Sequence, residues 1–262
     1  MASRSTESNA HASDQRRRAG ASAERQMAFY LHRAFGASEA VVVLNDLRLI
    51  DPSQPEHDGR AGVCQIDHLV LHRFGAIIVE SKSVFDEVSV RGDGAGGDEW
   101  TRRYQGREQG FASPIQQARR QGVFLRAYLH QHRASLLGKV SKGLRTMTKL
   151  LSGTDHRGFS LMPIQVVVAI SDGGKIRRVG GWTPPSDPFR TFVSKADLAA
   201  DKAHDEIKKH EAASRLLSKT DGEYGVWAMK PEEVGEVATF LRANHQPQPD
   251  APVAVSAPVP SA

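Results

Sequence analysis

Residues 65–82 read QIDHLVLHRFGAIIVESK, and this stretch decides the fold. Two strand-like runs, about 63–72 and 75–82, meet within it at a tight turn. Residues 76–79 of the second run are continuously apolar, as expected for a central strand that is covered on both faces. We therefore predict that these two runs form neighbouring strands at the centre of a sheet.

Three charged side chains lie on this strand pair. Side chains two residues apart in a strand point to the same face, so Glu80 and Lys82 should project together. Asp67 joins them if the two strands pair across the turn. The alternative is a surface Glu80–Lys82 ion pair, which would contribute roughly 0–1 kcal/mol to stability. Two carboxylates and one ammonium beside an apolar sheet favour a functional site.

Cleavage of a phosphodiester would explain these residue types. Asp67 and Glu80 supply the hard oxygen ligands that Mg²⁺ prefers, with Mn²⁺ as the alternative cofactor. Lys82 could orient the attacking water or offset negative charge in the transition state. Beside two carboxylates the Lys82 ammonium should stay protonated without metal. We therefore expect Asp67 and Glu80 to bind the metal.

Composition limits the class of protein. The chain has 262 residues, 39% hydrophobic and 25% charged, which allows one large domain or one domain with appendages. No run reaches the roughly 18 apolar residues that span a membrane, and the N-terminus lacks the apolar segment of a secretory signal. Cys64 is the single cysteine, which excludes an internal disulfide framework and a cysteine-clustered zinc site. We expect a cytoplasmic protein with no membrane association.

The positive charge is concentrated in one part of the chain. The net charge is +5, but residues 102–149 alone hold eleven Lys and Arg residues and one Glu. Such a basic stretch predicts a polyanionic partner, and we expect nucleic acid. Arg119, Arg120 and Arg126 are the candidate phosphate contacts, and a solvated helix face is the alternative for them.

Periodicity and breakers predict the remaining elements. The predicted helices are about 21–36, 114–133, 195–217 and 231–243, and the further strands are 40–50, 88–90 and 163–170. Residues 92–100 are a glycine-rich loop. This order of elements indicates an α/β fold with a mixed sheet.

The sequence resembles a known family at the predicted site. Asp67 followed by Glu80-Ser81-Lys82 resembles the D…(D/E)xK core of the PD-(D/E)xK nuclease superfamily, and within it the nuclease-related domain (NERD). The similarity covers roughly residues 20–130, with 163–170 as a continuation. It includes the helix of Glu24, the triplet Gln65-Ile66-Asp67, Phe74-Gly75, Trp100, and residues 113–118 (SPIQQA), which are similar to the family's NPxxQA segment.

The resemblance implies a restriction-endonuclease-like core with a central mixed β-sheet flanked by helices. It implies that Glu24, Asp67, Glu80 and Lys82 are the active-site acids and lysine, with Gln117 as an accessory polar residue. Alternatively, Glu24 is a first-turn acid that interacts with the helix dipole, and Gln117 is a structural hydrogen-bonding residue.

The chain departs from the family at three places. Gln65 stands where many members have Glu, Ser113 replaces the more common Asn, and the first helix lacks the usual glycines. The core acids and Lys82 are intact.

The predicted organisation is a disordered tail (1–20), a NERD nuclease-like domain (21–175), a C-terminal helical extension packed on the core (176–245) and a disordered Pro/Ala-rich tail (246–262). The favoured function is a Mg²⁺-dependent nuclease that acts on DNA in DNA processing or defence. One alternative is a non-catalytic nucleic-acid-binding or accessory module with the same fold. Another is a protein-interaction domain whose partner surface is 195–243.

Overall fold

The computed structural model describes residues 3–57, 60–104, 106–138, 145–215 and 224–248. The strands are β1 (Val41–Ile50), β2 (Glu56–His57), β3 (Arg60–Ala61), β4 (Val63–His72), β5 (Gly75–Lys82), β6 (Glu87–Gly92), β7 (Asp98–Tyr104), β8 (Arg107–Phe111), β9 (Ile164–Ile170), β10 (Lys175–Arg178) and β11 (Arg190–Lys195). The helices are α1 (Ser3–Phe35), α2 (Pro114–Gln131), α3 (Arg133–Leu136), α4 (Arg145–Ser152), the 3-10 helix η1 (Phe159–Leu161), α5 (Ala196–Ala213) and α6 (Pro231–Ala243).

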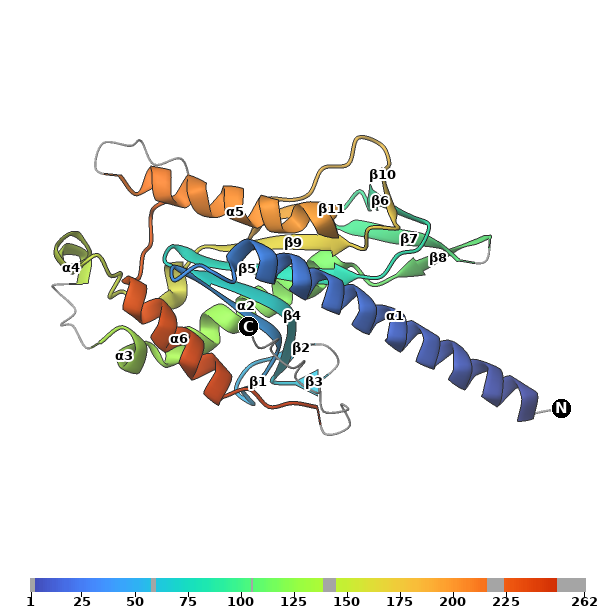
Figure 1. Cartoon of the computed structure of the whole chain (residues 1–262), viewed down its shortest axis with the longest axis horizontal. Coiled ribbons are helices and arrows are strands. Elements are labelled where there is room, and N and C mark those ends of the chain that lie inside the picture. The colour runs from blue at the N-terminus through green and yellow to red at the C-terminus, as the bar shows by residue number, and fades with distance from the viewer. Residues whose placement is uncertain (1–2, 58–59, 105, 139–144, 216–223, 249–262) are drawn as a thin grey trace, which may run out of the picture.

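A five-stranded mixed sheet forms the centre, in the order β1-β4-β5-β9-β11 (Figure 1). β1, β4 and β5 pair antiparallel, whereas β5, β9 and β11 pair parallel. Gly75 starts β5 where a Cβ atom would lie 2.3 Å from the Pro163 carbonyl oxygen, so the close approach of the two chain segments requires glycine. The predicted α/β fold with a central mixed sheet flanked by helices is confirmed.

Helices cover both faces of this sheet. Met27 and Leu31 of α1 pack with Ala199 and Ala203 of α5 against one face. α2 and α6 bury apolar side chains against the other face, in a cluster that contains Phe124, Leu125, Leu129, Val234, Val237 and Leu241. The apolar run 76–79 of β5 and the mainly apolar sequence of β9 agree with this burial on both sides.

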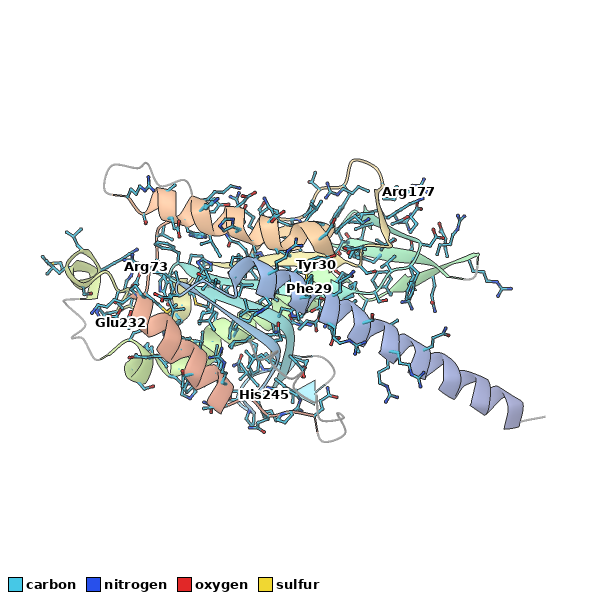
Figure 2. All side chains as sticks on the ribbon, in the orientation of Figure 1. Phe29, Tyr30, Arg73, Arg177, Glu232 and His245 are labelled. Carbon is cyan, nitrogen blue, oxygen red and sulfur yellow. The ribbon has the colours of Figure 1, made fainter. Side chains whose placement is uncertain are left out.

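The C-terminal half of α1 is fixed to the sheet next to β9. Tyr30 Oη and Gln26 Nε2 donate hydrogen bonds to Asp172 Oδ2, at 2.5 and 2.8 Å. Phe29 and Tyr30 lie where α1 crosses the sheet (Figure 2). The N-terminal part of α1 continues beyond the body of the molecule (Figure 1). Residues 3–20, for which we expected disorder, are therefore helical, because the polar segment extends the amphipathic helix.

A second sheet has the order β10-β6-β7-β8. The predicted strand 88–90 is the middle of β6, and only residues 93–97 of the predicted glycine-rich loop lie between β6 and β7. The β7–β8 hairpin was not predicted. Its residues, 98–111, are mainly polar and carry few of the β-branched residues that indicate strands.

The C-terminal region is more than a helical extension. β11 pairs with β9 as the edge of the central sheet, so a domain boundary at residue 175 would divide this sheet and is wrong. The first part of the expected tail is also fixed, since the backbone N–H of Gln246 donates to the Arg48 carbonyl oxygen at 2.9 Å. Residues 249–262 lie outside the described residues. Within the described residues, none of the helices has the length and apolar character needed to span a bilayer.

Candidate active site

All five predicted catalytic residues line one cleft of about 840 Å³. Asp67 comes from β4, Glu80 and Lys82 from β5, Gln117 from α2, and Glu24 from α1. The turn between β4 and β5 brings Asp67 to Glu80, as the spacing predicted. The capped start of α2 then brings Gln117, because Ser113 Oγ accepts a hydrogen bond from the Gln116 backbone N–H at 3.1 Å.

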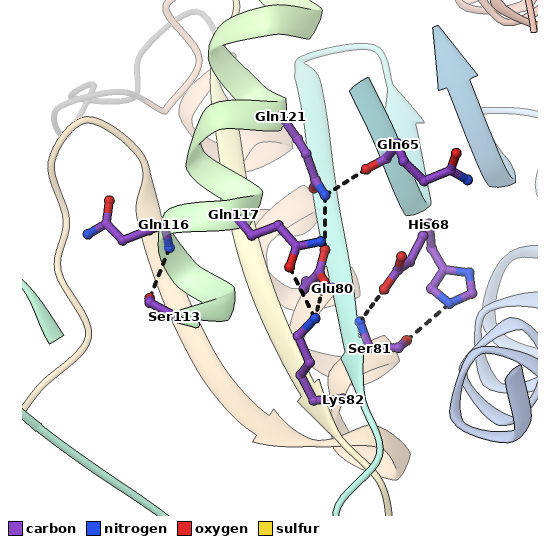
Figure 3. A network of polar contacts seen from close by, with 10 residues as sticks. Gln65, His68, Glu80, Ser81, Lys82, Ser113, Gln116, Gln117 and Gln121 are labelled. Atoms are coloured by element: carbon purple, nitrogen blue, oxygen red, sulfur yellow. Dashed lines mark hydrogen bonds and ion pairs between the residues drawn. The ribbon is translucent and has the colours of Figure 1, made fainter. Parts of the chain in front are cut away.

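The end of the β4–β5 ladder fixes Asp67. Backbone pairing stops at His68 and Val79, and Asp67 Oδ2 accepts a hydrogen bond from the Ser81 N–H at 2.8 Å. His68 Nε2 also lies 3.1 Å from Ser81 Oγ (Figure 3). The Ser81 contact holds the Asp67 carboxylate against β5, and Asp67 lines the cleft.

Glu80 is almost completely buried, with 1% of its surface exposed. Its Oε1 lies 2.5 Å from Lys82 Nζ, and its Oε2 accepts a hydrogen bond from Gln121 Nε2 at 3.1 Å (Figure 3). Lys82 Nζ also donates to Gln117 Oε1 at 3.2 Å. Glu80 and Lys82 therefore project together as predicted, and α2 holds both of them.

Gln121 is a site residue that the sequence analysis missed. It is fully buried and donates to the Gln65 carbonyl oxygen at 2.7 Å as well as to Glu80. It lies one helical turn after Gln117, which places both amides on the same face of α2. The signal was a second glutamine four residues after Gln117 in the predicted helix 114–133.

A backbone irregularity accompanies the site on β1. Asp46 has φ +53°, which is uncommon for a residue other than glycine, and it lies opposite Asp67 in the β1–β4 register. Gln65 Nε2 donates a hydrogen bond to Asp46 Oδ1. Gln65, which replaces the more common Glu, therefore satisfies a carboxylate instead of adding another one.

Two buried carboxyl groups share the Lys82 ammonium at the centre of the cleft. Burial raises the pKa of Glu80 to about 7, with Asp67 adding to the shift and Lys82 opposing it. Burial likewise raises the pKa of Asp67 to about 6 against the attraction of Lys82. Burial would lower the pKa of Lys82, but the attraction of Glu80 outweighs it and raises this pKa. The ammonium therefore stays charged, as predicted.

Glu24 lies at the rim of this cleft. Its side chain is exposed, yet loss of water around it and repulsion from Asp46 and Glu80 raise the pKa of its carboxyl group. The charge of Glu24 thus acts on the site, and the residue is more than a first-turn acid of the long helix α1, which begins far upstream at Ser3.

The donor set suits a hard divalent cation with few protein ligands. Asp67 and Glu80 supply carboxylate oxygens, and Gln121 Oε1 is buried with no hydrogen-bond partner among the described residues. A cation would also favour the ionised forms of both carboxyl groups, whose pKa values are raised mainly by burial. No group of three His, Cys, Asp or Glu residues in the described ranges is arranged to hold a metal. Two carboxylates leave several coordination positions of a bound ion to water. Mg²⁺ keeps several water ligands, so this small set of protein ligands suits it.

The predicted phosphate contacts lie outside the cleft. Arg119 donates to the Asp187 carbonyl oxygen, and Arg126 donates to the Met162 carbonyl oxygen at 2.7 Å. Arg120 is exposed but does not line the cleft. Three arginines that the sequence analysis did not single out line it instead: Arg18 of α1 and Arg102 and Arg103 of β7.

Comparison with known protein families gives one finding for this chain. A family described as "Nuclease-related domain" (NERD) matches residues 19–170, more than half of the 262 residues. The match includes every predicted catalytic residue and the whole of β4, β5, α2 and β9. Comparisons with curated proteins and with solved structures give no match.

Proposed function

Because the chain belongs to the nuclease-related domain (NERD) family, we propose that it is a metal-dependent nuclease that hydrolyses phosphodiester bonds of DNA. One observation carries the proposal: the buried carboxyl groups of Asp67 and Glu80, both with raised pKa values, meet Lys82 at a cleft. Buried carboxyl groups with raised pKa values in a cleft are typical of functional sites.

Each residue of the site would have a separate role in the reaction. Asp67 and Glu80 would hold Mg²⁺ or Mn²⁺, and Gln121 would keep the Glu80 carboxylate in place. When bound, the ion supplies Lewis acidity that activates water and neutralises charge on the phosphate. Lys82, fixed by Glu80 and Gln117, would donate hydrogen bonds to a phosphate oxygen or to water. Glu24 would support the site from the rim of the cleft.

DNA is the proposed substrate because basic side chains border the acidic centre. Arg18 lines the cleft from α1, and Arg102 and Arg103 line it from β7. These side chains would bind the phosphates on either side of the bond that is cleaved, without reading base sequence.

The direct test is cleavage of supercoiled, linear and single-stranded DNA with Mg²⁺, Mn²⁺ or EDTA. The wild-type protein should cleave only with a divalent ion, and Asp67→Ala and Lys82→Ala should each lower the rate by about 10²–10³-fold or more. Glu232→Gln is the matched control, since Glu232 is an exposed acid at the start of α6, away from α1 and β7 (Figure 2). The proposal fails if the wild type cleaves nothing that the two variants leave intact.

A second candidate is a nucleic-acid-binding module without turnover. Both Glu80 oxygens already have protein partners, Lys82 and Gln121, so the fold does not depend on a metal at this position. Calorimetric titration with Mn²⁺ separates the two functions. Binding that is lost in Asp67→Ala supports the nuclease, whereas DNA binding that is indifferent to metal and to Asp67 supports the module.

A further inference from the structure

Several elements line the cleft. Residues of α1 from Gln15 to Glu24 line it together with residues of β7 and β8. Its volume of about 840 Å³ lies in the range of roughly 300–1,000 Å³ that encloses a compact ligand. An unpaired polynucleotide strand can place single bases in a space of this size, whereas the bases of a duplex stay paired and stacked.

An exposed aromatic side chain stands in this cleft three residues after Lys82. Phe85 is 82% exposed and lines the cleft, although most phenylalanines of the chain are buried or half-buried. A single exposed apolar side chain is common on protein surfaces. The position of Phe85 beside the acidic centre, on a fixed backbone, distinguishes it from such a residue.

Hydrogen bonds on both sides fix the backbone of Phe85. The Val84 N–H donates to Ser171 Oγ at 2.9 Å, and Ser171 Oγ donates to the Val84 carbonyl oxygen at 2.7 Å. On the other side, the Lys175 N–H donates to the Asp86 carbonyl oxygen at 2.7 Å. The ring is thus presented to solvent by a rigid segment, which lowers the entropy cost of binding a partner.

Two arginines of β7 supply positive charge to the same cleft. Arg103 is exposed, and Arg102 lies with its Cζ 5.7 Å from the centroid of the Phe111 ring. An aromatic side chain beside a basic groove is the arrangement with which proteins bind single-stranded nucleic acid, because bases stack on the ring while arginines bind phosphates. The same groove would not offer stacking to the paired bases of a duplex.

We infer that the cleft selects an unpaired polynucleotide strand, and that Phe85 is the residue on which a base next to the cleaved phosphate stacks. The inference rests on the proposed function, because it assigns the strand form of the nuclease substrate. Phe85 binds substrate in this assignment, and the phosphate contacts fall to Arg102 and Arg103.

The experiment measures binding and cleavage separately. Fluorescence anisotropy with a labelled oligonucleotide, single-stranded or annealed to its complement, is recorded in EDTA and again in Ca²⁺ at several salt concentrations. We expect the single strand to bind at least about tenfold more tightly than the duplex. Phe85→Ala should weaken single-strand binding about tenfold, and Phe85→Trp should retain it.

Two further measurements identify the type of contact. Phe85→Ala should leave the salt dependence unchanged, because stacking releases no counterions, whereas Arg103→Ala should lower the salt slope by about 1. Fluorescence of 2-aminopurine in the oligonucleotide should be quenched on binding to the wild type but not to Phe85→Ala. Phe29→Ala is the matched control, since Phe29 is 60% exposed on α1 and does not line the cleft.

The outcomes separate this inference from the proposed nuclease. Equal or tighter binding of the duplex in both conditions, no binding of either form, or unchanged single-strand affinity in Phe85→Ala would overturn the inference. Cleavage of duplex DNA could still be observed in those cases and would support the nuclease. Conversely, selective single-strand binding with no metal-dependent cleavage of any DNA form would support selection of an unpaired strand by the cleft, but would contradict the nuclease and with it the assignment of Phe85 to a cleaved substrate.

Discussion

Glu80 and Glu206 are both buried glutamates, and the pKa values of their carboxyl groups shift in opposite directions. Glu80 is 1% exposed, and its pKa rises to about 7 because burial and the charge of Asp67 outweigh its partners. Glu206 on α5 is completely buried, and burial would raise its pKa too. Hydrogen bonds from Lys209, Tyr224 and Lys202 outweigh that effect and lower the pKa of Glu206.

The difference lies in how each charge is balanced. Lys209, Tyr224 and Lys202 lie 2.7, 2.5 and 3.0 Å from the Glu206 carboxylate, so its negative charge has two cations and a hydroxyl donor. Glu80 shares one cation, Lys82, with Asp67 and Glu24. A balanced buried carboxylate stabilises the fold. An unbalanced one at an open cleft is costly to the empty fold and indicates a site for a cation.

The largest expected effect is on catalysis. Glu80→Gln keeps the size of the side chain but removes a proposed metal ligand, so the rate of DNA cleavage should fall about 10³-fold. Glu206→Gln should leave the rate per folded molecule unchanged, because Glu206 does not line the cleft. Single-turnover cleavage with Mn²⁺ measures both. An equal fall of the cleavage rate in Glu80→Gln and Glu206→Gln would mean that Glu80 has no catalytic role that Glu206 lacks.

The second effect is on stability, and its sign should differ between the two sites. Without divalent ions at pH 8, Glu80→Gln should raise the free energy of unfolding by about 1–3 kcal/mol, because it removes an unbalanced buried charge. Glu206→Gln should lower it by about 1–3 kcal/mol, because buried donors lose their acceptor. Urea unfolding followed by circular dichroism measures both. Destabilisation by Glu80→Gln would show that the Glu80 charge is balanced after all.

The sequence was sufficient for one of these two regions. The apolar runs and the turn predicted β4 and β5, and strand alternation then predicted that Glu80 and Lys82 share a face. These are local properties, and the structure agrees with them. Glu206 was not singled out, because its partner Tyr224 is distant in sequence from the helical lysines and no period connects them.

Other features depended on how distant elements pack. Gln121 reaches Glu80 only because α2 lies at one particular register on β5, which helical periodicity does not define. β11 was missed because its strand character comes from pairing with β9. The basic residues of the cleft were assigned to α2, whereas the long α1 and the β7–β8 hairpin supply Arg18, Arg102 and Arg103.

A third prediction concerns the residue that holds Glu80. Gln121→Met is close in volume and removes both hydrogen bonds of the amide, so Mn²⁺ affinity should fall about 10–100-fold. Gln116→Met is the matched control on the same helix, because Gln116 points away from Glu80 (Figure 3). Calorimetric titration measures the affinities. Unchanged Mn²⁺ affinity in Gln121→Met would contradict a positioning role. If the affinity falls, the rate of DNA cleavage at saturating Mn²⁺ shows whether Gln121 acts on metal binding alone.

The last prediction concerns the pH dependence of stability without metal. Since the folded Glu80 has a pKa of about 7 and the unfolded one about 4.5, the folded chain retains a proton that the unfolded chain releases between these values. The contribution of Glu80 is therefore most favourable below pH 4.5 and is lost as pH rises through 7, by ~1.4 kcal/mol per pH unit. For Glu206 the pKa is lowered, so its contribution is present above pH 4.5 and is lost as pH falls below it.

Differences between variants isolate these contributions from other titrating groups. The buried His72, whose pKa burial lowers to about 3, stabilises the fold above pH 6.5 and progressively less below it, but equally in all three proteins. The stability gain of Glu80→Gln over the wild type should therefore grow from pH 4.5 to 7 and stay constant above. The loss in Glu206→Gln should shrink only below pH 4.5. Urea unfolding at half-unit pH intervals measures both curves, and a gain for Glu80→Gln that does not change with pH would mean that Glu80 carries no unbalanced charge.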